Sequence, residues 1–192
     1  MGRKVNGSGI RRELVAFTLS ALAVATTPAL AAVDSFVNIA GIDGESQDEQ
    51  HKGEIDVLSW SWGVNGASSR ASSTNPSQPV GPVARACARE FTITKQVDKA
   101  SPLLFANAAT GTSIPTALIT VRKAGRGQQE FMTITLSNVV VSSVTQSGAS
   151  EDAGPTESVT FNFSSVLITF TPQKADGSAG DPIKSPAPGS CP

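Results

Sequence analysis

Side chains that commonly perform catalysis or bind metals are scarce in this chain. Its 192 residues include one histidine, two cysteines and no tyrosine. These residues cannot form a zinc site of four cysteines, or of two cysteines and two histidines. The missing tyrosine argues against a binding face of the antibody kind, where tyrosine is the usual anchor. Basic and acidic residues nearly balance, at 15 and 16, which excludes a strongly basic nucleic-acid-binding protein.

Apolar residues are common enough to form a core. Hydrophobic residues make up 39% of the chain and charged residues 16%. A chain of this length and composition can bury a core and form one domain of moderate size. Beyond the N-terminal region, no apolar run approaches the ~20 residues of a membrane-spanning helix.

The N-terminal region has the pattern of an export signal. Residues 1–13 carry four basic side chains against one acidic one, and a largely apolar run of twelve follows from Leu14 to Ala25. As a helix this run would reach only ~18 Å, too short for a ~30 Å hydrocarbon core. We therefore expect a signal peptide and no stable membrane anchor. The alternative is an amphipathic helix of the mature protein.

Small residues after the apolar run indicate where the signal is cut. Ala29-Leu30-Ala31 supplies the small side chains that a signal peptidase requires. We expect cleavage after Ala31, with cleavage after Ala32 as the alternative. The Arg11-Arg12 pair also resembles a twin-arginine signal, so both export routes stay open. The protein is expected to be periplasmic or secreted.

Loss of the signal would change the charge. Residues 1–31 contain four of the 15 basic residues and one of the 16 acidic ones. The mature chain would therefore carry a net charge of about −4, which does not favour binding to DNA or to anionic lipid.

Cys87 and Cys191 are the two cysteines of the chain. In an oxidising compartment, two cysteines in a small domain often cross-link. By the loop-entropy model, so long a loop would contribute about 4–5 kcal/mol of stability. Two unpaired thiols, or an intermolecular link through Cys191, are the alternatives that stay open.

The rest of the chain has the pattern of β-structure. Short segments rich in Val, Ile, Thr and Phe recur between clusters of Gly, Ser, Asn and Pro. Within residues 55–62, Leu58, Trp60 and Trp62 alternate with Ser59 and Ser61, which predicts one apolar face. The two tryptophans are expected in the core. The candidate strands are residues 35–39, 55–62, 91–94, 117–122, 131–136, 139–145 and 158–171.

The last candidate strand contains a change of phase. Val159, Phe161 and Phe163 are odd-numbered, whereas Val166, Ile168 and Phe170 are even-numbered. One extra residue near Ser164-Ser165, as in a β-bulge, would keep all of them on one face. Bent strands of this kind are typical of barrels and curved sheets.

One helix and three irregular segments complete the pattern. Ser101 is a candidate N-cap, Pro102 fits the first turn, and Gly111 can adopt the left-handed C-terminal conformation. The irregular segments are an acidic loop at residues 43–53, which we expect to be exposed, a surface loop at 63–82, and a Pro-rich tail at 175–192, which we expect to be extended or mobile.

No residue pattern identifies a catalytic, cofactor-binding or metal site. His51 lies in the acidic loop, and we expect it to be an exposed structural residue, because no Gly-x-Ser-x-Gly motif supplies a nucleophile for it. Asp43, Glu45 and Glu54 partly match a calcium loop, but Asp48 stands where the sharp turn requires glycine. We therefore expect no catalytic residue, no cofactor and no bound metal.

Six segments resemble, in their order along the chain, a known bacterial family. They include VDSFVNIAGIDGES at residues 33–46, EIDVLSWSWG at 54–63 and TFTPQKADG at 169–177. The others are FTITKQVDKASPLL at 91–104, VRKAG at 121–125 and ITLSNVVVSSV at 134–144. With these motifs the chain resembles the Hcp (haemolysin-coregulated protein) family of type VI secretion tube proteins.

The resemblance implies a mainly β fold, an Hcp-like barrel of two packed antiparallel sheets with one short flanking helix at about 101–110. The barrel domain would span residues 32–177, between the signal peptide at 1–31 and a Pro-rich mobile tail at 178–192. The resemblance also implies hexameric rings that stack into a tube, with effectors in the lumen and spike and sheath proteins as partners, and no enzymatic step. The loop that reaches the next ring would include Asp43, Gly44, Glu45, Ser46, Asp48, Glu49 and His51.

The export signal supports a second hypothesis. A protein exported by its own signal is not readily loaded into a cytoplasmic sheath. The alternative function is therefore a stand-alone exported barrel that acts as a periplasmic or extracellular interaction module. An enzyme is a third and more distant hypothesis.

Overall fold

The computed structural model describes residues 1–2, 33–66, 86–124, 128–149 and 154–191. The expected signal peptide and its cleavage sites at Ala31 and Ala32 lie outside these residues, as does most of the 63–82 loop. Residues 31–192 form one unit. Within the described segments, no helix is long and apolar enough to cross a membrane.

Strands dominate the structure, as the alternation of apolar and polar residues predicts. One helix, α1 (Ser101–Thr110), lies where the sequence predicts it. The strands are β1 (Val33–Ile39), β2 (Ile55–Asp56), β3 (Ser59–Ser61), β4 (Val64–Asn65), β5 (Cys87–Ala88), β6 (Phe91–Gln96), β7 (Ser113–Lys123), β8 (Glu130–Ser147), β9 (Thr156–Asn162), β10 (Ser165–Phe170) and β11 (Ile183–Pro188).

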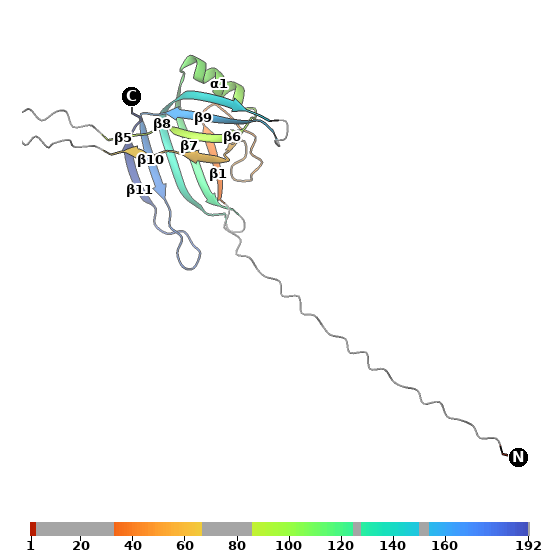
Figure 1. Cartoon of the computed structure of the whole chain (residues 1–192). Helices are drawn as coiled ribbons and strands as arrows, with labels where there is room; N and C mark the ends of the chain where they lie inside the picture. The colour runs from red at the N-terminus through yellow and green to blue at the C-terminus, as the bar shows by residue number, and fades with distance from the viewer. Residues whose placement is uncertain (3–32, 67–85, 125–127, 150–153, 192) are drawn as a thin grey trace, which may run out of the picture. The chain divides into compact units, whose positions relative to one another are not determined.

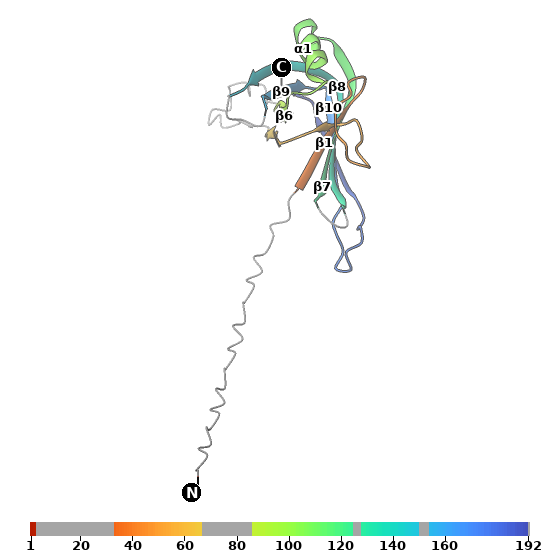
Figure 2. The same cartoon turned by 90° about the vertical axis from the view of Figure 1, so that its right-hand side faces the viewer.

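Nine of these strands form one antiparallel sheet. Its order is β2-β1-β7-β8-β9-β6-β3, with β10 paired to β8 and β11 paired to β10. β4 and β5 form a separate two-stranded sheet. The large sheet is strongly curved, and both views place α1 and the turn between β10 and β11 at opposite ends of it (Figures 1 and 2). The expected mainly β class with one helix is confirmed.

The curved sheet does not close into the expected barrel of two sheets. β2 pairs with β1, and Val57 N still donates to the β1 residue Ser35. Leu58 N then donates to Thr94 O of β6 at 2.8 Å, and β3 pairs with β6. The covalent chain itself therefore crosses from one edge of the sheet to the other. β2 and β3 are only two and three residues long, too short for a ladder across this gap.

The apolar face expected for residues 55–62 is interrupted at this crossing. Leu58 lies at the crossing and is 59% exposed. Trp60 and Trp62 are half-buried as expected, with ring centroids 6.1 Å and 6.3 Å from that of Phe91. Their stacking continues the core to this edge of the sheet.

The phase change in the last long strand occurs where the sequence predicts it, but without an extra residue. Asn162 pairs with Val140, and Ser165 pairs with Ser137. The two pairs lie the same number of positions apart on both strands, so neither strand contains an extra residue. On β8, the buried positions also change phase: they are even-numbered up to Leu136 and odd-numbered from Val139. The change occurs at Asn138, which adopts a φ of 48°. Asn138 Nδ2 donates to Ser164 Oγ at 2.9 Å. Both strands therefore bend together and keep their register.

The N-terminal end of α1 differs from the prediction, whereas its C-terminal end agrees with it. Ser101 is not the N-cap of α1: it is the first residue of the helix, and the N-cap, Ala100, makes no side-chain cap hydrogen bond. Asp98 Oδ1 instead accepts from Ala100 N at 2.9 Å. At the other end Gly111 has the predicted left-handed conformation, with a φ of 64°.

The Pro-rich tail is extended as expected, but it is paired rather than mobile. Residues Ile183–Pro188 form β11 and lie in register with all six residues of β10. Cys191, beyond β11, forms a disulfide with Cys87, with 5.2 Å between the Cα atoms. Alternating prolines do not prevent this pairing, because β11 is an edge strand that needs donors on one side only.

A buried ion pair anchors α1 to the sheet. Lys95 on β6 and Glu157 on β9 are both fully buried, and Lys95 Nζ lies 2.9 Å from Glu157 Oε1 and 2.6 Å from Asp98 Oδ1. Ser101 Oγ donates to Glu157 Oε1 at 2.8 Å, and Gln146 Nε2 donates to Oε2 at 2.9 Å. Burial raises the pKa of Glu157, but the hydrogen bonds from Lys95, Gln146 and Ser101 outweigh it and lower the pKa.

We predict that Glu157→Ala lowers the free energy of unfolding by about 3–5 kcal/mol, because it leaves the Lys95 ammonium buried with less compensation. Urea denaturation followed by tryptophan fluorescence measures the loss. Glu157→Gln, which keeps the shape of the side chain, should cost less. The exposed Glu49 provides the control, since Glu49→Ala should change stability by less than about 0.5 kcal/mol. Equal effects at residues 157 and 49 would contradict the assigned role.

Candidate functional site

The acidic loop between β1 and β2 is the segment that the resemblance assigns to assembly. Two backbone hydrogen bonds connect its two sides, from Gly44 N to Gly53 O at 2.8 Å and from Gly53 N to Ser46 O at 2.9 Å. A third runs from Ser46 N to Glu54 O at 3.0 Å. A Cβ on residue 44 would lie 2.3 Å from Glu54 O, so this close approach of the two sides requires glycine. The loop is therefore a narrow arm held by its own backbone, which we call the β1–β2 arm (residues 43–54).

Burial alternates along the first side of the β1–β2 arm. Gly44 and Ser46 are buried, whereas Asp43, Glu45 and Gln47 are exposed. Glu49, at the tip, is also exposed. The arm therefore presents three carboxylates to solvent from a backbone that is fixed on its inner side.

A buried arginine holds the tip of the arm. Arg122 on β7 is only 2% exposed. Its Nη1 donates to Asp48 Oδ1 at 2.9 Å, and its Nη2 donates to Asp48 Oδ2 and, at 3.3 Å, to Asp34 Oδ2. The guanidinium also lies 4.8 Å from the centroid of the Phe36 ring. A planar group with two parallel donors suits this bidentate and stacked position, which lysine could not fill.

Asp48 connects the arginine to the backbone of the tip. Its Oδ1 accepts hydrogen bonds from Gln50 N at 2.9 Å and from His51 N at 3.2 Å. The hydrogen bonds from Arg122, together with these backbone donors, lower the pKa of Asp48 to about 2 against the effect of burial. In turn, the hydrogen bonds that Arg122 donates to Asp48 and Asp34 raise the pKa of Arg122. The tip is thus held by a charge pair that persists over the whole physiological pH range.

His51 is buried, and the expectation of an exposed histidine is wrong. Its exposed fraction is 5%, and its ring stacks on Phe36 with a centroid distance of 4.2 Å. Nδ1 lies 3.0 Å from Glu54 Oε2, and Nε2 lies 3.6 Å from Glu130 Oε1. The partners on β1 and β8 are distant in the sequence, so no local pattern indicated the burial. Glu54, considered above as a calcium ligand, instead contacts His51 and Asn38.

The structure therefore divides the predicted assembly residues into two groups. Gly44, Ser46 and His51 are buried and shape the β1–β2 arm, and Asp48 is tied to Arg122. Asp43, Glu45 and Glu49 remain available for contact. Sequence reasoning missed the residues outside the arm that position it. These are Asp34 and Phe36 on β1, Arg122 on β7 and Glu130 on β8.

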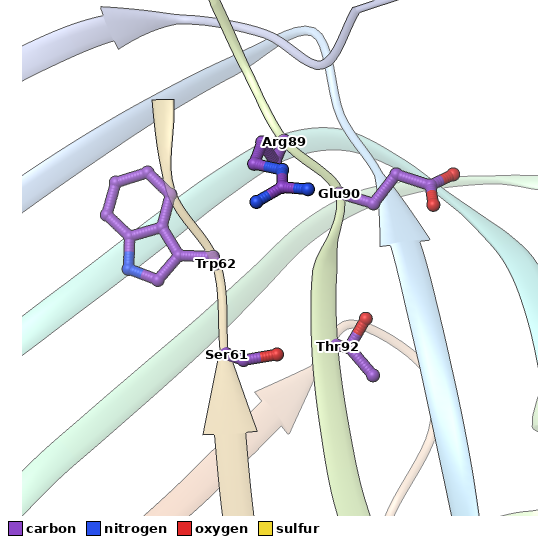
Figure 3. Close-up of a pocket in the computed structure, with 5 residues that line it drawn as sticks. All are labelled: Ser61, Trp62, Arg89, Glu90 and Thr92. Carbon is purple, nitrogen blue, oxygen red and sulfur yellow. The ribbon is translucent and has the colours of Figure 1, made fainter. Parts of the chain in front are cut away.

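A separate hollow of about 330 Å³ lies beside β3 and β6. It is lined by Ser61, Trp62, Arg89, Glu90 and Thr92. Figure 3 shows the Arg89 guanidinium directed toward the side of Trp62, whereas the Glu90 carboxylate points the other way. These side chains form a polar surface beside an indole and do not converge on one point.

We predict that Asp48 stays ionised, and the tip of the β1–β2 arm stays attached, until the pH falls toward 2. A folded-state pKa below the ordinary value of 3.8 means that the stabilisation is present above that value and is lost as pH falls through the lowered pKa. Arg122→Gln should return the pKa of Asp48 toward 3.8 and speed amide exchange at the tip. Carboxyl carbon NMR titration measures both proteins.

Arg89→Gln, which removes an exposed arginine, is the control for this titration and should leave Asp48 unchanged. An Asp48 that titrates near 3.8 in the unsubstituted protein would contradict the interpretation.

Comparison with known proteins agrees with the geometry. A family model described as "Type VI secretion system effector, Hcp" matches residues 36–170. Protein hcp1 of Pseudomonas aeruginosa is 40% identical over 155 residues, which cover 80% of this chain and 93% of that protein.

Solved structures of similar proteins share the fold. Hcp1 from Salmonella typhimurium matches with a TM-score of 0.62 and 31% identity, over 82% of this chain and 94% of that one. A type VI secretion system effector from Yersinia pestis matches with a TM-score of 0.65 and 29% identity, over 81% of this chain and 99% of that one. The chain therefore belongs to the Hcp family, the tube proteins of the type VI secretion system.

Proposed function

We propose that this chain forms hexameric rings that stack into a hollow tube, with the β1–β2 arm of each subunit contacting the next ring. The observation that carries the proposal is the arm itself. It is fixed from inside by Arg122 and His51, and it presents Asp43, Glu45 and Glu49 outward. Membership of the Hcp family supports the same role.

A preformed arm suits repeated assembly. Association is costly when a loop must be ordered at the interface, and a segment that is already rigid avoids that cost. The ion pair between the buried Arg122 and the half-buried Asp48 supplies the rigidity. The exposed carboxylates then select a partner surface of opposite charge and favour one orientation.

Ring closure requires only two complementary surfaces on each subunit. A head-to-tail interface closes into a ring when the rotation between neighbours is suitable. Such a protein needs no catalytic step, and we propose that this one is structural. Effector proteins in the lumen, the spike and the sheath are its proposed partners.

A second function is favoured by the disulfide between Cys87 and Cys191. Disulfides persist in oxidising compartments and are rare in the cytoplasm. Together with the proposed signal peptide at residues 1–31, the bond supports a stand-alone exported barrel that acts as a periplasmic or extracellular interaction module. The two functions differ in whether the protein assembles into tubes and in which compartment holds it. One experiment tests each difference.

The first experiment is electron microscopy of the purified protein. Six-fold rings and stacked tubes are expected if the tube proposal is correct, and monomers at high concentration would contradict it. Asp43→Lys with Glu49→Lys should leave single rings but reduce stacking, because the exposed carboxylates change sign. Asp176→Lys with Asp181→Lys reverses two exposed acidic residues outside the arm and is the matched control. Loss of stacking in the control as well would assign the effect to net charge.

The second experiment is N-terminal sequencing of the protein from the cell envelope and the medium. We expect the mature chain to begin at Ala32 or Val33. Ala31→Glu should block cleavage, because the peptidase requires a small residue before the cut. Arg11→Lys with Arg12→Lys tests the twin-arginine route. An intact Met1 in the cytoplasm, with no processed form, would disprove the export proposal.

A further inference from the structure

The C-terminal strand β11 is an edge strand of the large sheet. Among the described strands it pairs with β10 and with no other. Five of its six residues are exposed, and Ala187 alone packs against the core. Few buried contacts and a single paired edge give an element a low cost of local opening.

Two anchors at its ends hold β11 in place. At the start, the turn from Pro172 is closed by a hydrogen bond from Gly180 N to Pro172 O at 2.7 Å. At the end, Ser190 N donates to Phe163 O at 2.9 Å, and the Ser190 hydroxyl accepts from Phe163 N at 2.9 Å. A Cβ on Gly189 would lie 2.3 Å from Phe163 O, so this end fits closely against the bend between β9 and β10.

The disulfide is the covalent part of the second anchor. Cys191 N donates to Ala88 O at 3.0 Å, and Ala88 N donates to Gly189 O at 2.9 Å, so the end of the chain runs beside β5 (Figure 1). The bond from Cys191 to Cys87 joins the same two segments. Both cysteines are half-buried, so the bond lies near the surface.

We propose that the Cys87–Cys191 disulfide is a redox latch on β11. With the bond closed, β11 stays paired with β10. A dithiol reductant supplies two electrons and two protons: the S–S bond breaks, each cysteine sulfur becomes a thiol, and the reductant becomes a disulfide. Without the bond, β11 opens from its C-terminal end and turns about the 172–180 segment.

The rest of the sheet stays folded when the latch opens. β10 keeps its six pairs with β8, and Val166 on β10 is 2% exposed. The edge of β10 is then free to accept another strand, because its outer N–H and C=O groups lose their partners. The redox state of the compartment thereby decides whether this sheet edge is covered. The inference does not depend on ring assembly.

Hydrogen exchange followed by mass spectrometry tests the latch on the purified chain. We compare the oxidised protein, the protein reduced with dithiothreitol, and the Cys87→Ser, Cys191→Ser double variant. Amides of residues 183–187 should exchange about tenfold faster or more in the second and third samples, while β7 and β8 amides change by less than about twofold.

Two variants calibrate the measurement. Ser190→Ala with the disulfide intact loses the hydroxyl hydrogen bond to Phe163 N but keeps the covalent bond, so β11 should stay closed. Gly189→Ala places a Cβ against Phe163 O and should open β11 even in the oxidised protein. Unchanged exchange in β11 on reduction would overturn the proposal, and so would equal acceleration in β7 and β8, which would indicate global unfolding.

Discussion

The rest of the fold depends on one bend, which β8 shares with the β9–β10 segment at Asn138 and Ser164. β8 is 18 residues long and pairs with β7 along one edge and with β9 and β10 along the other. A straight strand of that length would turn its apolar side chains away from the core beyond the bend. Because β8 and the β9–β10 segment change phase together, the paired strands serve both parts of the curved core and keep their register through the bend. The register of β8 with β9 shifts farther along, between Val141 and Ser143.

The buried charges of this protein position segments more than they stabilise the sheet. Removing two charges from water costs about as much as their attraction returns, and such pairs contribute chiefly when their partners are fixed. Lys95 and Glu157 fix the start of α1, and Arg122 and Asp48 fix the tip of the β1–β2 arm. In both cases a residue within a strand holds a segment that lies outside the large sheet.

Local patterns predicted the elements, and long-range contacts decided the site. The alternation in residues 91–94 and 158–163 indicated strands correctly, and Pro102 and Gly111 bounded the helix, because these signals depend on neighbours in the sequence. The burial of His51 depends on Phe36 and Glu130, which come from strands far apart in the sequence. Arg122 looked like the polar end of a strand, and only the fold shows that Asp48 lies over it. The pairing of the Pro-rich tail was not predicted for the same reason. It depends on the edge of β10, with which a strand that contains proline can pair.

In the proposed assembly, the β1–β2 arm separates the residues that determine its shape from those that contact the next ring. Its inner contacts come from β1, β7 and β8, and none of them involves Asp43, Glu45 or Glu49. Substitutions at these three outward positions therefore leave the arm's geometry intact while changing the surface it presents. In the proposed assembly, recognition resides in a few side chains that the fold does not need, so related tube proteins can share one scaffold while their subunits do not mix.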